Sequence, residues 1–242
     1  MTYFDGFLMP VPSGNKDGFI AYSHHSDTLF AQHGARRIVE CWPQSVDAIA
    51  LSSAGPGIDA RDGEAVAFSW IEWRDKDARM QGMAALDPII RTDPHFNPDI
   101  NPPPFDTGRV MWGCFETLAD LGQSAEASVV QALVFVARDE QKEAIRHFAT
   151  QAWLPPRDAG ALRMVIGWDD GAQAGHQNSS FEHLRESNGG KAALLFVEWP
   201  STVLPVSIAA AFLPIFGFLS EMNAATVYSG LLTPIVQVAA AD

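Results

Sequence analysis

Cysteine and positive charge are scarce in this sequence of 242 residues. It has 2 cysteines, and 16 lysine and arginine residues stand against 29 aspartate and glutamate residues, for a formal net charge of −13. Cys41 and Cys114 are too few and too far apart for a disulfide framework, so we expect a reducing, cytoplasmic setting. The shortage of positive charge argues against a nucleic-acid partner, because the phosphate backbone requires clustered Lys and Arg.

Targeting and membrane segments are also not expected. The N-terminal residues have neither a basic region nor a long apolar stretch, so they do not resemble a signal peptide. The segment 200–220 is uncharged and approaches the length of a bilayer span, but prolines at positions 205 and 214 interrupt it. We therefore expect an acidic protein without a membrane partner.

A repeat organises the chain. GARRIVECW at 34–42 resembles GALRMVIGW at 160–168, and the two begin 126 residues apart (160 − 34). The same offset aligns SWIEW with LFVEW and AALDPI with AAFLPI, and it changes only near the last strand of each copy, to 117 (230 − 113). The second copy thus lacks nine residues of a Pro-rich loop (126 − 117). A nearly constant offset predicts a duplication, with units at 1–122 and 127–242.

The first unit has the pattern of a ferredoxin-like fold. Its strand-like segments are apolar at both odd and even positions. Because successive side chains of a strand point to opposite faces, both faces of the sheet should be covered. We predict an α+β protein in which two tandem ferredoxin-like (βαββαβ) repeats pack their antiparallel sheets together as an intrachain α/β-barrel pseudo-dimer. The expected strands of the first unit are 3–11, 36–42, 64–73 and 109–118, and its expected helices are 16–32 and 75–90.

Two of the predicted helices have informative patterns. In the helix at 16–32, Phe19, Tyr22, Leu29 and Phe30 are available for an apolar stripe, and Asp17, Ser23 and Asp27 lie elsewhere. The segment 203–219 is apolar all round, although the matching helix of the first unit is charged. A helix of this kind is usually buried. We expect it to pack against the other repeat or against a second subunit, as in a homodimer.

Several motifs together resemble the YbaA-like bacterial family of unknown function. They are DGFLMPVP, GARRIVECW, VAFSWIEW, the Leu-Asp-Pro at 86–88 and PFDTGRVMWGCFE, and they span roughly residues 2–120. The resemblance implies the dimeric α/β-barrel superfamily, in which two ferredoxin-like subunits pair sheet to sheet. That superfamily includes cofactor-independent monooxygenases, haem enzymes, isomerases and proteins without demonstrated activity, so the fold does not choose a function.

The candidate catalytic residues are Glu40, Glu72 and Arg109. Strands two and three of a ferredoxin-like unit are neighbours, so Glu40 and Glu72 could approach each other. Paired carboxylates in an apolar setting raise one pKa and supply a general acid or base. Arg109 would stabilise developing negative charge. Alternatively, both glutamates lie at strand ends in solvent or pair with Arg36 or Arg37.

The candidate ligand-binding residues are mostly aromatic or lie next to Glu40. Cys41 would be a nucleophile only with a lowered pKa, and it is equally explained as a small buried side chain. His176, Glu182 and His183 have the right types for a metal site but no convincing spacing. We therefore expect no metal and no cofactor. The predicted ligand-binding residues are Cys41, Trp42, Ser69, Trp70 and Asp106.

Two hypotheses for function follow from these residues. In the first, the first unit binds a small aromatic or enolisable molecule and oxidises or isomerises it without a cofactor. In the second, a non-catalytic stress or assembly protein uses the apolar helix at 203–219 for protein-protein contact. An inward-facing Glu40 or Glu72 in a pocket favours the first hypothesis, and a filled barrel with an exposed apolar helix favours the second.

Overall fold

A computed structural model describes residues 1–44, 53–54, 58–123, 126–171, 181 and 189–240. In the first half, four long strands and two helices follow the predicted order and nearly the predicted bounds. The helices are α1 (Lys16–Gln32) and α2 (Lys76–Ile90), and the strands are β1 (Tyr3–Pro12), β2 (Ala35–Pro43), β4 (Glu64–Trp73) and β5 (Met111–Gly122). A short strand, β3 (Ser53–Ala54), and the 3-10 turns η1 (Ser13–Asn15), η2 (Pro94–Phe96) and η3 (Thr107–Arg109) lie between them.

The second half has the same order of long elements. Its strands are β6 (Val129–Ala137), β7 (Arg163–Asp169), β8 (Lys191–Trp199) and β9 (Ala225–Ala239). Its helices are α3 (Lys142–Asp158) and α5 (Pro205–Glu221), and the 3-10 turn η4 (Asp139–Gln141) precedes α3. Gly34 and Gly160, the recurring glycines, both have a positive φ where α1 and α3 give way to the next strand. Glycine recurs there because it takes this conformation without steric cost.

The strands form one closed antiparallel barrel. Hydrogen-bonded neighbours run in the order β2-β4-β1-β5-β7-β8-β6-β9, and β9 pairs with β2 to close the ring. Each half contributes four neighbouring strands, β5-β1-β4-β2 in the first half and β9-β6-β8-β7 in the second. When the long strands of each half are numbered 1 to 4 along the chain, both orders are 4-1-3-2, as expected for a ferredoxin-like unit. The short strand β3 pairs with β9. The predicted α+β class and the antiparallel eight-stranded barrel are confirmed. That the halves are copies of one ancestor stays a prediction.

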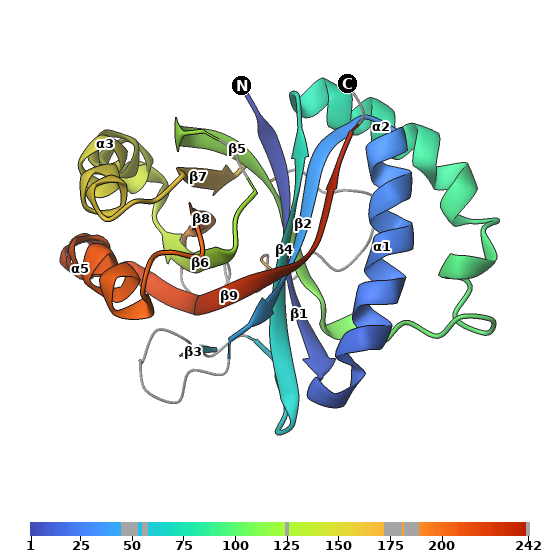
Figure 1. Cartoon of the computed structure of the whole chain (residues 1–242). Helices are drawn as coiled ribbons and strands as arrows, with labels where there is room; N and C mark the ends of the chain where they lie inside the picture. The colour runs from blue at the N-terminus through green and yellow to red at the C-terminus, as the bar shows by residue number, and fades with distance from the viewer. Residues whose placement is uncertain (45–52, 55–57, 124–125, 172–180, 182–188, 241–242) are drawn as a thin grey trace.

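The helices lie on opposite sides of the barrel. Figure 1 shows α1 and α2 beside the strands of the first half, and α3 and α5 beside those of the second half. Apolar side chains from both halves fill the barrel interior, including Phe4, Phe68, Phe115 and Phe196. Both faces of the strands are therefore covered, which explains why the strand sequences are apolar at both parities.

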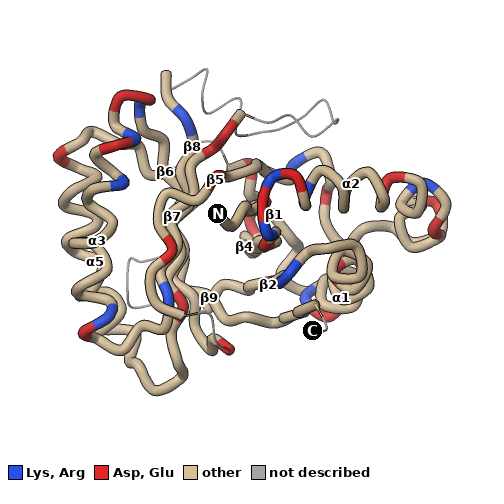
Figure 2. Tube along the Cα trace, turned by 90° about the horizontal axis from the view of Figure 1, so that it is seen from above, with Lys and Arg blue, Asp and Glu red and all other residues tan. Residues whose placement is uncertain are grey.

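The apolar helix packs against its own half. Phe212 and Ile215 of α5 are buried in one core cluster with α3 and the outer face of the second-half strands. The helix was expected to pack against the other repeat or against a second subunit. The first alternative is wrong, and the second stays a prediction. Leu213 is 68% exposed, so part of the apolar surface faces outward. Glu221 is the one charged residue of α5, whereas charged residues are frequent at the start of α2, as Figure 2 shows. No helix among the described residues is long and apolar enough to cross a membrane.

Candidate functional site

A cavity of about 540 Å³ lies between α1 and the outer face of the first-half strands. The apolar layer under α1 and α2 is divided into two separate core clusters, one around Trp73 and Ile38 and the other around Phe19 and Trp42. Under α3 and α5, by contrast, one large cluster covers the sheet. The cavity therefore occupies the place where the apolar layer of the first half is interrupted.

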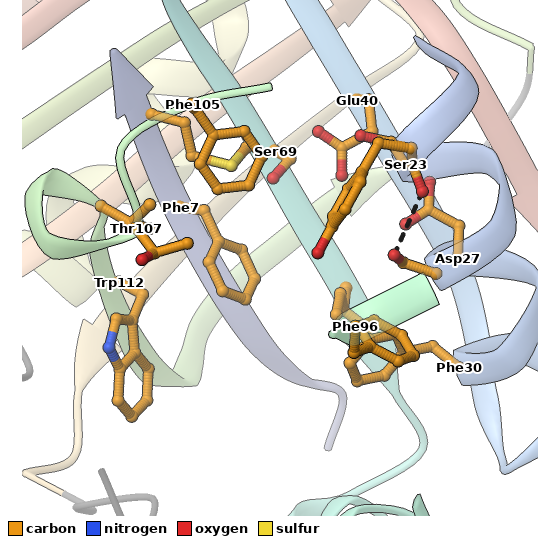
Figure 3. Close-up of a pocket in the computed structure, with 15 residues that line it drawn as sticks. Phe7, Ser23, Asp27, Phe30, Glu40, Ser69, Phe96, Phe105, Thr107 and Trp112 are labelled. Atoms are coloured by element: carbon orange, nitrogen blue, oxygen red, sulfur yellow. Dashed lines mark hydrogen bonds between the residues drawn. The ribbon is translucent and has the colours of Figure 1, made fainter. Parts of the chain in front are cut away.

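One row of residues across the sheet forms the cavity floor. Strand register places Ser69 of β4 opposite both Phe7 of β1 and Glu40 of β2, and it places Phe7 opposite Trp112 of β5. Side chains of directly opposed residues point to the same face of a sheet. Glu40, Ser69, Phe7 and Trp112 therefore face α1 together, and all four line the cavity (Figure 3).

The helix above the floor contributes polar side chains at helical spacing. Phe19, Ser23 and Asp27 are four residues apart and are the buried residues of α1. This spacing places them on one face of the helix. The expectation that Ser23 and Asp27 lie away from the buried stripe was therefore wrong. Ser23 and Asp27 line the cavity opposite Glu40, as Figure 3 shows.

Glu40 and Asp27 form a buried carboxyl pair. Glu40 is 7% exposed and Asp27 is 4% exposed. Burial and the nearby Asp27 raise the pKa of Glu40 well above its ordinary value, and the hydroxyl of Ser69 donates a hydrogen bond that partly opposes this. Burial raises the pKa of Asp27 to about 8. Asp27 Oδ2 and Glu40 Oε2 have no hydrogen-bond partner among the described residues. Burial therefore favours the protonated form of both carboxyl groups, and each has an oxygen atom that a ligand can contact.

A Pro-rich segment forms the outer wall of the cavity. Three of its residues line the cavity. Phe96 is the last residue of η2, and Phe105 and Thr107 come shortly before β5. The ring of His95 lies 4.4 Å from the ring of Tyr22 on α1, and Asn15 Nδ2 donates a hydrogen bond of 3.2 Å to the carbonyl of Pro104. These contacts hold the segment against α1. The predicted nine-residue difference between the halves falls in this segment.

Glu72 does not meet Glu40, and the predicted Glu40–Glu72 pair is wrong. Arg37 is opposite Glu72 in the β2–β4 pairing, whereas Glu40 is opposite Ser69. Glu40 thus faces α1, and Glu72 faces the barrel interior. There Glu72 Oε1 accepts hydrogen bonds from Trp70 Nε1 at 2.9 Å and Arg163 Nη1 at 2.8 Å.

The interior charges form a network across the two halves. Arg37 Nη2 donates to Glu198 Oε1 at 2.5 Å, while Arg163 binds Glu72 from the other half. Arg37 and Arg163 are 126 positions apart, as are Glu72 and Glu198. Each arginine therefore makes its shortest contact with the glutamate of the other half. Its contact with the glutamate of its own half is longer, at 3.4 Å for Arg37–Glu72, which was one of the expected alternatives, and at 3.6 Å for Arg163–Glu198. This network accounts for the recurring Arg of GARR and GALR and for the recurring Glu of IEW and VEW.

The other predicted ligand-binding residues divide between the barrel and the sheet surface. Cys41 and Trp70 are fully buried in the barrel interior, where Trp70 stacks on Phe196 at 4.3 Å. Burial raises the pKa of the Cys41 thiol well above its ordinary value, which opposes a nucleophilic role. Trp42 packs against Phe19 under α1. Of the predicted ligand-binding residues, only Ser69 lines the cavity with Glu40.

Arg109 is held by acidic partners outside the cavity lining. Its Nη2 and Nη1 donate to the two carboxylate oxygens of Glu64 at 2.6 and 2.7 Å, and its Nε donates to Asp106 at 3.0 Å. Asp106 also accepts from the amide of Gly108 at 3.0 Å. Arg109 therefore ties the start of β4 to the turn before β5, and this contradicts its predicted role beside Glu40.

The described residues contain no group of three or more His, Cys, Asp and Glu side chains arranged to hold a metal. The candidate residues His176, Glu182 and His183 lie outside the described part of the chain. Cys41 and Cys114 are both free and buried. They lie on different faces of the sheet, because Cys41 belongs to the barrel interior and Cys114 to a cluster under α2.

The matching positions of the second half are apolar. An offset of 126 takes Ser23 to Ala149, Glu40 to Ile166 and Ser69 to Leu195. Ala149, Ile166 and Leu195 all belong to the continuous cluster under α3 and α5. The polar cavity is therefore a property of the first half. In the second half, apolar side chains occupy the positions that match the cavity floor and the helix above it.

Comparisons with known proteins agree with this division. Residues 2–107 match the family described as a protein of unknown function, DUF1428. The uncharacterised protein YbaA of Escherichia coli K12 is 34% identical over 120 residues, which are 50% of this chain and 99% of YbaA. The chain belongs to the DUF1428 family. The DUF1428 match includes Glu40, Asp27 and Ser69, and the filled second half lies beyond it.

Solved structures with the same barrel extend over both halves of this DUF1428 protein. A monooxygenase candidate from Lactobacillus acidophilus NCFM has a TM-score of 0.56 at 12% identity and covers 98% of this chain and 96% of its own. A second monooxygenase candidate, from Fusobacterium nucleatum, has a TM-score of 0.58 at 9% identity, covering 98% and 94%. An anthrone oxidase-like protein has a TM-score of 0.55 at 14% identity, covering 100% and 94%. At these identities the likeness concerns the fold alone.

Proposed function

We propose that the first half of this protein binds a small enolisable aromatic molecule in the cavity under α1, and that Asp27 and Glu40 exchange protons with it. The observation that carries the proposal is the pair of buried carboxyl groups, each with an unpartnered oxygen, in a cavity lined mainly by apolar and aromatic side chains. A volume of about 540 Å³ lies within the usual range for small-molecule sites.

The pair supplies an acid and a base side by side. With a pKa of about 8, Asp27 is ionised in part at neutral pH and can take a proton from a phenolic hydroxyl or from a carbon next to a carbonyl group. Burial and the nearby Asp27 raise the pKa of Glu40 well above its ordinary value, which favours the protonated form, and this form can donate a hydrogen bond to the oxyanion that forms. The substrate leaves this step as a phenolate or enolate.

Two reactions can follow proton removal. In an isomerisation, the proton returns to another carbon of the same molecule. In an oxidation, dioxygen is the co-reactant: one oxygen atom replaces the two hydrogens of an activated methylene group as a carbonyl oxygen, and the other leaves with those hydrogens as water. The names of the barrel neighbours, monooxygenase and anthrone oxidase-like, favour the oxidation.

The experiment uses anthrone as the probe and measures proton exchange and oxygen uptake separately. We expect the protein to accelerate exchange of the anthrone methylene protons into deuterated water, with oxygen uptake if the oxidation operates. Asp27→Asn and Glu40→Gln should each reduce the exchange rate at least tenfold, consistent with the usual size of acid-base catalysis. Glu221→Gln, at the exposed end of α5, is the control and should leave the rate unchanged.

Mass spectrometry of molecules retained by the native protein gives a test that does not depend on anthrone. A retained aromatic compound that is lost in Ser69→Leu supports the site. Rates and retained molecules that are identical in the wild type and both carboxyl variants would refute the proposal.

The two halves also support an evolutionary inference. We infer that residues 1–122 and 127–242 are tandem ferredoxin-like copies, of which the second kept the interior Arg-Glu pairs and lost the cavity. The 4-1-3-2 strand order in each half and the 126-residue offset of the network support this inference. The assembly hypothesis is less favoured, because α5 buries one face against its own half. A homodimer through the outer face of α5 stays a hypothesis.

A further inference from the structure

A second cavity of about 200 Å³ lies beside the first, toward α2. Two residues of α2, Arg79 and Met83, line this second cavity and do not line the first. The residues that line both cavities are Phe7, Phe30, Ile71 and Trp112. Because these four side chains are shared, the two spaces lie side by side under the helices.

The strand register gives the direction of the combined site. Glu40, Ser69, Phe7 and Trp112 form one row across the sheet, and Asp5 lies two residues along β1 from Phe7, on the same face. Glu40 and Asp5 are two strands and two residues apart. Strand spacing and rise per residue place their backbones roughly 12 Å from each other. The combined site is therefore elongated, with carboxyl groups at one end and Arg79 at the other.

Arg79 has donors left over at its end of the site. Its Nε donates to Asp5 Oδ1 at 2.6 Å, and Asp5 also accepts from Trp73 Nε1 at 2.8 Å and from the thiol of Cys114 at 3.2 Å. Within the described part of the chain, the Nη groups of Arg79 make no hydrogen bond. Arg79 is nonetheless 7% exposed. The Nη groups are not among the fully buried atoms that lack a partner, and Arg79 lines the second cavity, so these donors are accessible to a ligand there.

The charge balance selects the kind of acceptor. Arg79 and Asp5 form a buried ion pair whose formal charges cancel. Burial and the nearby Asp5 raise the pKa of the Cys114 thiol, which is therefore protonated and adds no charge. A second carboxylate here would leave an excess negative charge in a buried place, which is costly. A neutral carbonyl oxygen can accept from the Nη groups without that cost.

We propose that Arg79 is a specificity-determining residue that binds a carbonyl oxygen at the far end of an elongated aromatic ligand. The hydroxyl or acidic carbon of that ligand lies at Glu40 and Asp27, and its rings lie against Phe7 and Trp112. The inference rests on the proposed function for the placement of the reacting end. It adds the substrate class: fused or linked aromatic rings with a hydroxyl at one end and a ketone or quinone oxygen at the other.

The experiment compares three probes by calorimetry. They are phenol, a naphthol that carries an acetyl group on the far ring, and the same naphthol with an ethyl group at that position. The two naphthols have nearly the same shape, so their difference isolates the carbonyl acceptor. We expect the wild type to bind the acetyl compound about tenfold more tightly than the ethyl compound, the usual effect of one hydrogen bond to a charged donor.

Three variants assign that preference. Arg79→Lys keeps a positive charge beside Asp5 but loses the planar guanidinium group with its Nη donors. The ratio of the affinities for the acetyl and ethyl compounds should therefore fall to nearly one. Met83→Trp fills the second cavity and should weaken both naphthols while leaving phenol binding intact. Lys76→Ala, at an exposed ion pair on the same helix, is the control and should keep the preference.

The outcomes separate the two proposals. If the wild type binds phenol and both naphthols with no preference for the acetyl group, the role of Arg79 is refuted and the cavity under α1 still stands. A preference that survives in Arg79→Lys and Met83→Trp also refutes it. If none of the probes binds and no molecule is retained by the native protein, the proposed function fails as well.

Discussion

Replacement of Asp27 by asparagine should stabilise the protein, and the gain should depend on pH. In the folded protein burial raises the pKa of Asp27 to about 8, whereas an aspartate in an unfolded chain titrates near about 3.9. Between these values unfolding releases a proton. The stability associated with the protonated carboxyl is therefore fully present below about pH 4 and is lost as the pH rises toward 8.

The magnitude follows from the release of one proton. Each pH unit in this window lowers the free energy of unfolding of the wild type by about 1.4 kcal/mol relative to a variant that cannot ionise at this position. Asparagine has nearly the same shape and no charge. The advantage of Asp27→Asn should thus grow by about 2.7 kcal/mol from about pH 5.5 to about pH 7.5, and it should level off above pH 8.

Urea titrations followed by tryptophan fluorescence at several pH values measure this difference. Asp17→Asn is the matched control, because it changes an exposed carboxyl to an amide on the same helix. It should leave the pH dependence of the wild type in place. An Asp27→Asn advantage that stays constant over the whole range would mean that Asp27 is charged in the folded protein. Such a result would contradict the raised pKa from which the proton transfer between Asp27 and the substrate was proposed.

Three further predictions test the framework around the site. Arg163→Met should lower the free energy of unfolding by about 3–5 kcal/mol, because it removes the nearer arginine from the buried Glu72 and leaves only the longer contact of 3.4 Å with Arg37; addition of Glu72→Met should restore much of the loss, and a loss below about 1 kcal/mol in urea unfolding would contradict this account. Ser69→Leu introduces the residue found at the matching position of the second half, so calorimetry should show at least tenfold weaker probe binding and the melting temperature should not fall; unchanged affinity would place the ligand elsewhere. Cys41 and Cys114 should react with a thiol reagent only after urea unfolds the protein, because burial raises the pKa of both thiols; rapid native reaction of either would contradict their buried placement.

The framework could be predicted because it depends on periodic patterns. The bounds of α1 and β4 match the expected segments, since capping glycine, apolar alternation and charge distribution are local properties. The 126-residue offset also predicted a two-part barrel. It did not predict how the halves join, because the pairings of β5 with β7 and of β2 with β9 connect segments that share no local signal.

The site was only half predicted, and the reason is geometric. Glu40 was recognised as a candidate acid or base, but its partner was sought on a neighbouring strand. Glu72 was chosen, but Glu40 and Glu72 point to opposite faces of the sheet. The face to which each side chain points depends on the strand register, which the sequence alone does not give. Asp27 was available at the four-residue spacing from Phe19 and Ser23. It was overlooked because a stripe was expected to be apolar.

The comparison between halves turns this oversight into an argument for function. Both halves build the same helix-on-sheet layer, and the second shows that this layer is stable when the positions of Ser23, Glu40 and Ser69 carry Ala149, Ile166 and Leu195. Burial of two carboxyl groups in the first half therefore contributes nothing that the fold requires and opposes stability above pH 4. Residues that weaken a fold where an apolar alternative is available are expected where a ligand or a reaction needs them. The cavity between Asp27 and Glu40 meets that description, and the interior glutamates, each paired with an arginine, do not.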